Sequence, residues 1–279
     1  MKTKTLFIAL IAAGLTFASC QRTEPLEDSS IEAADDAIVA EAYYDDVFSS
    51  LEIATVIAEA PLKSASVIDT CPIITFTYPD EGFWPRNVTI DYGTSCTGLN
   101  DVVRSGKIII AMSAPRRTEG SVRTVSFDNY TVNGAKVEGT YTVENIGLNS
   151  NENTVFSVAL SGGMITFSDE RTITRTFLRE REYTEGYDTW TPWDDKCLIT
   201  GYATGTNLNG VAYTHSITSA LEWQAACRFI VSGTIEFDIE GVEPFVLDYG
   251  NGECDATATL SRGDDSRVIT LRLWHPKYL

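Results

Sequence analysis

The sequence predicts an all-β protein, an antiparallel meander of about ten to twelve strands preceded by one helix near the N-terminus. After residue 65, Thr, Val, Ile, Tyr and Phe dominate, and the three- to four-residue apolar spacing of a helix disappears. Turn-forming residues recur at intervals too short for a crossover helix, so consecutive strands should pair antiparallel. This pattern is compatible with a barrel, a sandwich or a curved sheet.

The N-terminus has the features of a bacterial export signal. Lys2 and Lys4 precede an apolar run over residues 6–18, which at 13 residues is shorter than the roughly 20 that a transmembrane helix needs. The run ends in small residues followed by Cys20, which resembles the lipobox of bacterial lipoproteins. We expect a signal peptide over 1–19, cut before Cys20, whose thiol and amine are then acylated to anchor the protein. The alternative is an ordinary signal peptide with an incidental cysteine.

The chain is acidic. It carries 39 Asp and Glu against 21 Lys and Arg, a formal net charge of −18. Removal of the signal peptide takes away two lysines and no acid, which leaves 39 acids against 19 bases, or −20. Such a surface repels phosphate backbones, so we expect no nucleic-acid partner.

The N-terminal region of the mature chain has a helical pattern. Apolar residues recur at three- and four-residue steps from Ile31 to Ala54, and Pro61 follows as a stop signal. We expect this apolar stripe to pack on the β region; the alternative is a solvated stalk. The predicted organisation is an acidic tether over 20–30, a helix over 31–60 and a single β domain over 65–279.

Turn signals containing glycine separate the predicted strands. Asn133-Gly134 lies between two alternating apolar segments, which is the strongest short-range signal for a hairpin. By the same reasoning we expect strand reversals at 133–134, 162–163, 209–210, 240–241 and 263–265.

One predicted strand, residues 172–182, is polar on both faces. Arg175, Arg179 and Arg181 share one of its faces with two apolar residues. A strand with three arginines on one face does not suit the centre of a dry sandwich. We therefore place it at a sheet edge, or in a part of the sheet that extends beyond the core.

Two segments of the chain repeat the same pattern. Cys71 and Cys227 each lead through an Asp-Tyr-Gly turn to a second cysteine, Cys96 or Cys254, and an arginine follows that cysteine by eight residues in both copies. We expect disulfides Cys71–Cys96 and Cys227–Cys254, each contributing about 3.5 kcal/mol in the chain-entropy model. Cys197 is left over, as a buried free thiol or as a competitor for Cys227.

Four stretches of the chain are similar to a family of Bacteroidota lipoproteins. They are DYG…C…GKIII (91–110), FDNYTVNGAKVEGT (127–140), ITG…GTNLNG (199–210) and VSGTI…DYGNGEC (231–254). The similarity extends over residues 31–273, including the acidic helix. The family carries no assigned activity, so the resemblance implies an envelope location and no catalytic residue.

The best candidate site is an aromatic loop. Exposed aromatic faces stack on sugar rings, and adjacent carboxylates accept hydrogen bonds from hydroxyl groups. We therefore predict a glycan site formed by Tyr187, Trp190, Trp193 and Asp194. The alternative is that these aromatic residues cap the end of a sheet and are buried in the domain.

The sequence contains only weak signals for metal binding and none for catalysis. One Gly-rich turn contains four side chains whose oxygen atoms could bind calcium: Asp248, Asn251, Glu253 and Asp255. The alternative is that these residues only form the turn, because Asp, Asn and Gly are common in tight turns. His215 and His275 are the only histidines, and no cysteine pair has the spacing of a zinc motif. No nucleophile, metalloprotease or nucleotide-binding motif occurs. We expect no metal, no cofactor and no catalytic residue.

These observations predict a non-catalytic, lipid-anchored protein of the bacterial cell envelope. We expect it at the outer membrane, on the periplasmic face or the cell surface. Its predicted partners are membrane lipid, through acylated Cys20, and a glycan or another envelope protein. The alternatives are a structural or assembly scaffold of the envelope and, third, a glycan hydrolase.

Overall fold

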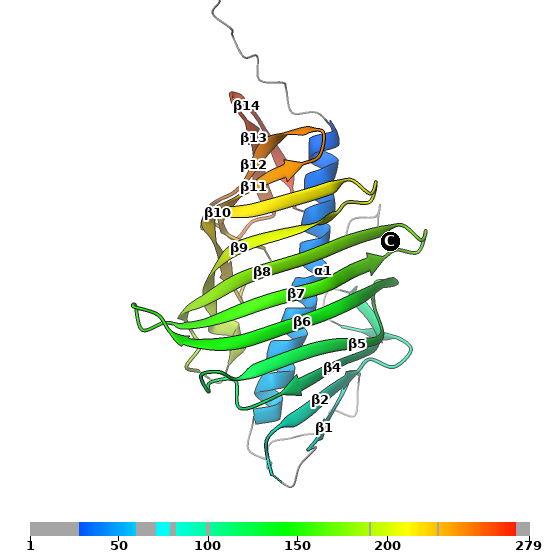
Figure 1. Cartoon of the computed structure of the whole chain (residues 1–279), viewed down its shortest axis with the longest axis vertical. Helices are drawn as coiled ribbons and strands as arrows, with labels where there is room; N and C mark the ends of the chain where they lie inside the picture. The colour runs from blue at the N-terminus through cyan, green and yellow to red at the C-terminus, as the bar shows by residue number, and fades with distance from the viewer. Residues whose placement is uncertain are drawn as a thin grey trace, which may run out of the picture.

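A computed structural model describes residues 28–59, 71–78, 82–98, 101–189, 191–227 and 229–271. One long helix and 14 strands are the main elements of this part of the chain (Figure 1). The predicted fold class is confirmed, because α1 (Asp28–Glu59) precedes a single antiparallel meander that does not close. Of the three shapes left open by the sequence, the structure is the curved sheet, with more strands than predicted. The strands are β1 (Ile73–Thr77), β2 (Arg86–Asp91), β3 (Cys96–Thr97), β4 (Val103–Met112), β5 (Val122–Val132), β6 (Ala135–Leu148), β7 (Thr154–Thr166), β8 (Thr172–Glu185), β9 (Lys196–Thr206), β10 (Ala212–Gln224), β11 (Ser232–Ile239), β12 (Val242–Asn251), β13 (Thr257–Arg262) and β14 (Asp265–Thr270).

The order of strands in the sheet follows their order in the chain. Neighbours pair antiparallel from β1 to β14, and the short strand β3 pairs beside this path with β4. This arrangement follows from the short connections, because parallel neighbours need a long crossover. Strands β1 and β14 therefore form the two edges of the sheet in the described part of the chain.

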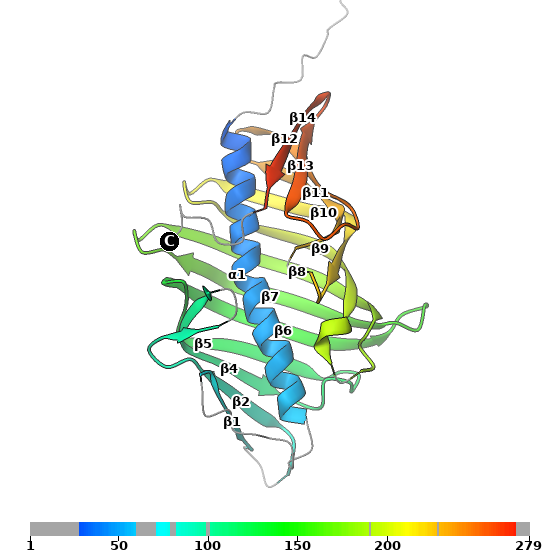
Figure 2. The ribbon, with the colours of Figure 1, turned by 180° about the vertical axis from the view of Figure 1, so that it is seen from behind.

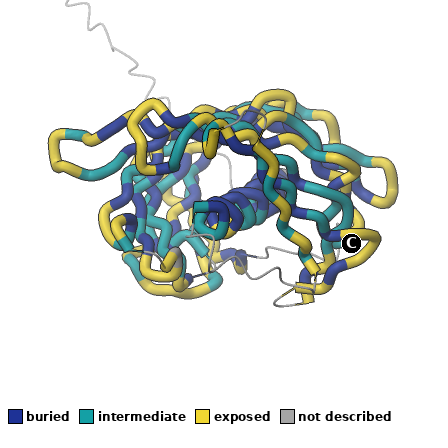
Figure 3. The backbone as a smooth tube through the Cα atoms, turned by 90° about the horizontal axis from the view of Figure 1, so that it is seen from below, coloured by how far each residue is buried: buried dark blue, intermediate teal, exposed yellow. Residues whose placement is uncertain are grey.

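The helix α1 forms the centre of the core, and the sheet curves around it (Figures 2 and 3). Ala34, Val47, Leu51 and Ala54 are fully buried, which confirms the predicted packing of the apolar stripe and rules out a solvated stalk. The helix begins at Asp28, three residues earlier than predicted and inside the expected tether. No helix in the described part of the chain is both long enough and apolar enough to cross a membrane.

Four of the five predicted strand reversals are confirmed. They lie between β5 and β6, β9 and β10, β11 and β12, and β13 and β14. The prediction at 162–163 is wrong, because β7 continues as one strand whose pairing with β8 shifts between Leu160 and Gly163. A Cβ atom on Gly163 would lie 2.5 Å from the carbonyl oxygen of Arg175. This glycine therefore permits close strand approach at a bulge instead of a turn.

The arginine-rich strand β8 lies inside the sheet, which corrects its predicted place at an edge. It pairs with β7 on one side and with β9 on the other. The side chains of Arg175, Arg179 and Arg181 are at most 2% exposed and form ion pairs with Glu41 and Asp45 of α1. The prediction of an edge position assumed a core made only of apolar side chains. Here the acidic helix supplies the partners that allow charged side chains to be buried.

Both predicted disulfides are present. Cys71–Cys96 and Cys227–Cys254 join residues whose Cα atoms are 5.6 and 5.8 Å apart. Cys197 on β9 is buried and free, so it does not compete for Cys227.

The repeated sequence pattern corresponds to a repeated structure at the two ends of the sheet. In both copies the Asp carboxylate, of Asp91 or Asp248, accepts a hydrogen bond from the glycine N–H two residues later at 2.8 Å. We refer to residues 71–112 as the N-terminal module and to residues 227–271 as the C-terminal module. The strands that pack most closely on α1 are β2 of the first module, β12 of the second and β8 midway between them.

Candidate binding pocket

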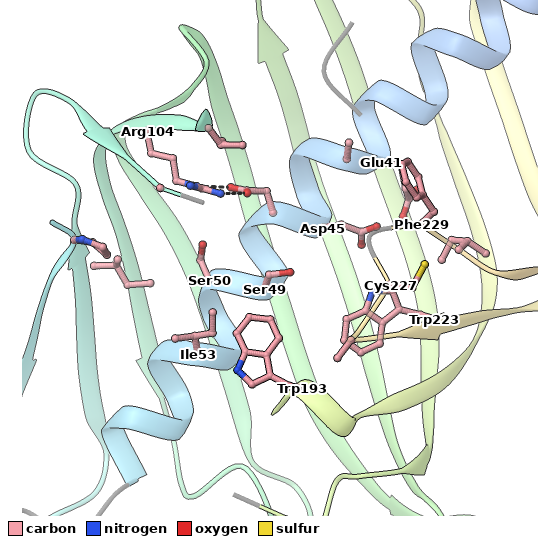
Figure 4. A pocket seen from close by; sticks show the side chains of 18 of the residues that line it. Glu41, Asp45, Ser49, Ser50, Ile53, Arg104, Trp193, Trp223, Cys227 and Phe229 are labelled. Atoms are coloured by element: carbon pink, nitrogen blue, oxygen red, sulfur yellow. Dashed lines mark hydrogen bonds and ion pairs between the residues drawn. The ribbon is translucent and has the colours of Figure 1, made fainter. Parts of the chain in front are cut away.

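A cavity of about 490 Å³ lies along α1 (Figure 4). It is on the side of the helix that the curved sheet leaves uncovered (Figure 2). This volume is in the range of pockets that hold small organic ligands. The helix forms the floor of the cavity. The walls come from the N-terminal module, from the C-terminal module and from two tryptophans between them in sequence, Trp193 and Trp223.

The floor combines a polar stripe of the helix with apolar side chains of the same helix, Ile38, Ala42, Ile53 and Ile57. Asp45 and Ser49 follow Glu41 at four-residue steps, and Ser50 follows Asp46 at the same interval. Residues three and four apart on a helix are neighbours on its surface, so the five side chains form one continuous polar face. Figure 4 shows this face between the two walls.

The walls are apolar and rich in aromatic rings. Tyr92 of the N-terminal module and Tyr249 of the C-terminal module both line the cavity. Trp223 of β10 and Trp193 of the short helix η2 (Pro192–Asp194) complete the walls, and Trp193 is 61% exposed at the surface. Aromatic side chains of this kind offer a flat apolar face together with a polar edge.

Arginines of β8 hold two carboxylates of the floor. Arg179 binds both oxygens of Glu41, and Arg181 donates to Asp45 Oδ1 at 2.9 Å. Although burial favours the neutral acid, Arg179 and Arg175 hold the pKa of Glu41 well below its usual range. Burial, together with the neighbouring Glu41 carboxylate, raises the pKa of Asp45 to about 6. The two carboxylates therefore respond differently to pH, and both remain tied to the sheet.

The other side of the floor is tied to the N-terminal module. Arg104 donates to both oxygens of Asp46, with Nε 2.9 Å from Oδ2, and the Tyr130 hydroxyl donates to Oδ2 at 3.0 Å. The hydroxyl groups of Ser50 and Tyr92 are 3.0 Å apart. A hydroxyl group has one donor and two acceptor sites, so this pair retains capacity to bind a polar ligand.

Among the described residues of the predicted aromatic patch, Trp193 alone lines the pocket. Tyr187 is buried outside the pocket lining, and its hydroxyl donates to the Arg116 carbonyl at 3.1 Å, so its ring offers no face to a ligand in the pocket. Asp194 is exposed on η2 outside the pocket lining. Trp190 lies outside the described residues.

Sequence reasoning missed most of the pocket. The local sequence does not indicate that Trp223 lines a pocket, because an aromatic residue in a strand is usually part of the core. Tyr92 and Tyr249 were visible as the same position of the two repeated segments, but that repeat was interpreted only as a disulfide framework. The polar stripe on the helix was visible as an interruption of the apolar spacing at 41, 45 and 49.

The described residues contain no group of three or more His, Cys, Asp or Glu side chains arranged to hold a metal ion. The carboxylates of Asp248 and Asp255 each accept a hydrogen bond from the backbone N–H two residues later, which is turn chemistry. His215 is buried on β10, with Nε2 3.1 Å from an Arg175 nitrogen, and burial and Arg175 hold its pKa well below the usual range. His275 lies outside the described residues.

Comparison with known proteins finds no relative: no protein-family model, no curated protein and no solved structure matches the chain. A functional assignment therefore depends on the geometry and chemistry of the pocket.

Proposed function

We propose that the protein is a non-catalytic, lipid-anchored binding protein of the bacterial envelope, and that its pocket takes a neutral or amino-sugar glycan. The observation that carries this proposal is the combination of a polar helix floor with aromatic walls. A sugar ring has apolar faces that stack on aromatic side chains and hydroxyl groups that bond to carboxylates and serines. The pocket offers both kinds of partner at once.

A purely hydrocarbon ligand fits the floor poorly. Glu41, Asp45 and Asp46 keep their arginine partners, but any carboxylate lone pair still open to water would lose that water beneath such a ligand and gain no hydrogen bond in return, which costs free energy. The exposed serine Ser49 would be covered in the same way. A polyhydroxylated ligand replaces the lost water with its own donors.

The charge of the protein favours sugars without acidic groups. The chain carries a net charge of −18, whereas the three carboxylates of the pocket lining are paired with Arg104, Arg175, Arg179 and Arg181. The long-range field of the whole protein therefore attracts amino sugars, tolerates neutral sugars and repels uronic acids and phosphorylated glycans.

The carboxylates of the floor favour binding over hydrolysis. Glycoside hydrolysis needs one carboxyl group free to protonate the leaving oxygen and a second free to attack or to activate water. Glu41 and Asp46 each have both oxygens engaged by an arginine, and Asp45 accepts from Arg181. We therefore propose no turnover at this site.

The anchor belongs to the same proposal. Cys20 as an acylated residue would leave seven residues before α1 begins at Asp28. Such a short connection would hold the β body and its pocket close to the membrane surface. The proposed location is the outer membrane, as the resemblance to Bacteroidota lipoproteins implies.

The test is glycan-array binding by the detergent-solubilised full chain and its variants. We expect binding to neutral or amino-sugar oligosaccharides that weakens about tenfold, or about 1.4 kcal/mol, in Trp193→Ala and in Trp223→Ala. Phe83→Ala is the control, because Phe83 is 66% exposed and does not line the pocket. Unchanged binding in both tryptophan variants, or no binding of any such glycan by the wild type, would overturn the proposal.

A scaffold function remains a second candidate because, in the part of the chain that the structure describes, neither edge strand has a second neighbour and both carry exposed apolar residues. Ile73 on β1 and Val268 on β14 are large exposed side chains at these edges. Open edges accept further strands from a partner. A co-purifying envelope protein that is lost with Val268→Lys, but kept with Leu178→Lys on β8, would favour this function.

A further inference from the structure

The two walls of the pocket are built from copies of the same sequence module. Ile74 and Ile230 each lie three residues after the first cysteine of their module, and Tyr92 and Tyr249 each follow the Asp of the repeated turn. All four residues line the cavity. Figure 4 shows that the two modules, marked by Arg104 and Phe229, approach α1 from opposite sides.

Each module offers its tyrosine to a different part of the polar stripe. Tyr92 lies 3.0 Å from Ser50 through the hydroxyl oxygens, beside the Asp46–Arg104 ion pair. Tyr249 lines the cavity together with Glu41 and Asp45, and the negative charges of these two residues add to the effect of burial in raising its pKa. The two sides of the pocket therefore share an isoleucine, a tyrosine and a carboxylate of the helix, and they differ in that Arg104 lines the N-terminal side alone.

The repeated arginines both contact the helix, through different partners. Arg104 and Arg262 each follow the second cysteine of their module by eight residues. Arg104 binds Asp46, and Arg262 Nη2 donates to Ser30 Oγ at 2.9 Å. Corresponding side chains thus reach α1 from both ends of the sheet.

The two sides of the pocket contact different lengths of the helix. The Glu41–Asp45 pair and the Asp46–Ser50 pair are centred five residues apart on α1, which corresponds to about 7.5 Å along the helix axis. We propose, on the basis of the proposed glycan-binding function, that the pocket has two like subsites and binds a glycan as two consecutive sugar units, one beside each module. Linking two units makes the second binding event intramolecular, so a disaccharide gains affinity over a monosaccharide without any new contact.

The test compares sugar lengths on the wild type and on variants that fill one subsite at a time. Glucosamine and its β-1,4-linked dimer are titrated into the full chain by calorimetry, with glucose and cellobiose as the uncharged pair. Ile74→Trp fills the side of the N-terminal module, and Ile230→Trp fills the side of the C-terminal module. Leu178→Trp, on β8 outside the pocket, is the control for the added bulk. The thermal unfolding midpoint of each variant verifies folding.

We expect the wild type to bind the dimer on the order of 100-fold more tightly than the monosaccharide. Each filling variant should reduce dimer affinity to about that of the monosaccharide, and should change monosaccharide affinity about twofold, because one subsite of two remains. Equal affinity for dimer and monosaccharide in the wild type, or loss of dimer binding in only one of the two variants, would overturn the two-subsite proposal and leave glycan binding standing. Absence of binding of all four sugars by the wild type would instead overturn the proposed function.

Discussion

Arg123 of β5 and Glu52 of α1 form a buried ion pair, with Nη1 and Oε1 2.6 Å apart and side chains 2% and 8% exposed. Arg116 also donates to this carboxylate, at 3.3 Å. Similar contacts join Asp46 to Arg104 and the Glu41–Asp45 region to β8. The helix is therefore fixed in its rotation and position by charge pairs, and these pairs hold its polar stripe toward the pocket.

Removal of one partner of the Arg123–Glu52 pair should destabilise the protein strongly. Arg123→Met leaves Glu52 buried with only the longer Arg116 contact, and we expect a loss of about 3–5 kcal/mol in the free energy of unfolding. Urea unfolding measures this loss. The double variant Arg123→Met/Glu52→Met should recover part of it, because Glu52 no longer lacks its main partner and Arg116 keeps Glu59, 3.8 Å away, as an acidic neighbour.

The control for this prediction is a surface pair of the same sheet. Lys136 and Glu138 are 2.7 Å apart but well exposed, so Lys136→Met should change stability by less than about 1 kcal/mol. Equal effects of the Lys136 and Arg123 substitutions would contradict the assignment of the arginines as structural partners of the helix.

The sequence predicted features that depend on local chemistry or on repetition. Asn133-Gly134 predicts its hairpin because few residues other than glycine and asparagine suit that turn. The disulfide Cys71–Cys96 was predictable because a second copy of the pattern exists. Gly163 was misinterpreted because a glycine at a bulge and a glycine at a turn look alike without knowledge of the neighbouring strand.

Features that depend on distant partners were not predictable in the same way. The arginines of β8 seemed to exclude it from a core, and only contact with Glu41 and Asp45, more than 100 residues away in sequence, explains their burial. Tyr187 was placed at the surface for a similar reason, since local sequence does not show which aromatic residue of a loop turns inward. The acidic helix and the arginine-rich strand are both visible in the sequence. Their opposite charges could have predicted that they pack against each other.

Asp195 should make stability fall as pH rises. Burial, the largest cause, raises its pKa to about 7, above an unfolded value near 3.8. Between pH 4 and 7 the unfolded chain has lost this proton while the folded protein retains it, so folding becomes less favourable as pH increases. Asp195→Asn removes this titration, and the variant should gain about 2–4 kcal/mol relative to wild type between pH 4 and 7.

The measurement is urea unfolding of Asp195→Asn and wild type across this pH range. Asp169→Asn is the control, because the hydrogen bond from Arg171 lowers the pKa of that exposed carboxyl, so its contribution to stability is lost only at more acidic pH and its effect should be nearly constant across this range. A difference between Asp195→Asn and wild type that does not change with pH would refute the prediction.

The disulfide arrangement predicts which thiol reacts. After denaturation without reductant, Cys197 should be alkylated, and peptide mapping should recover Cys71 joined to Cys96 and Cys227 joined to Cys254. The double variant Cys71→Ala/Cys96→Ala should lose about 2–4 kcal/mol of stability. Recovery of a Cys197–Cys227 peptide would contradict the equivalence of the two modules.

The anchor depends on a single side chain. Cys20→Ser should yield either soluble protein or the uncleaved precursor, because serine cannot carry the thioether-linked lipid. Cys197→Ser should leave the protein in the detergent-requiring membrane fraction. Recovery of mature, membrane-bound Cys20→Ser protein by fractionation would show that the lipoprotein interpretation is wrong.

The pocket itself can be observed through its tryptophans. In protein labelled with ¹⁵N at tryptophan and titrated with the β-1,4-linked glucosamine dimer, NMR resolves the indole N–H signal of each tryptophan, and single Trp→Phe variants assign the signals. The account predicts that the signals of Trp193 and Trp223 shift with saturation, while that of Trp84, which does not line the pocket, stays in place. Saturable binding that shifts Trp84 and leaves Trp193 and Trp223 unchanged would show that the sugar binds elsewhere and would contradict the central claim.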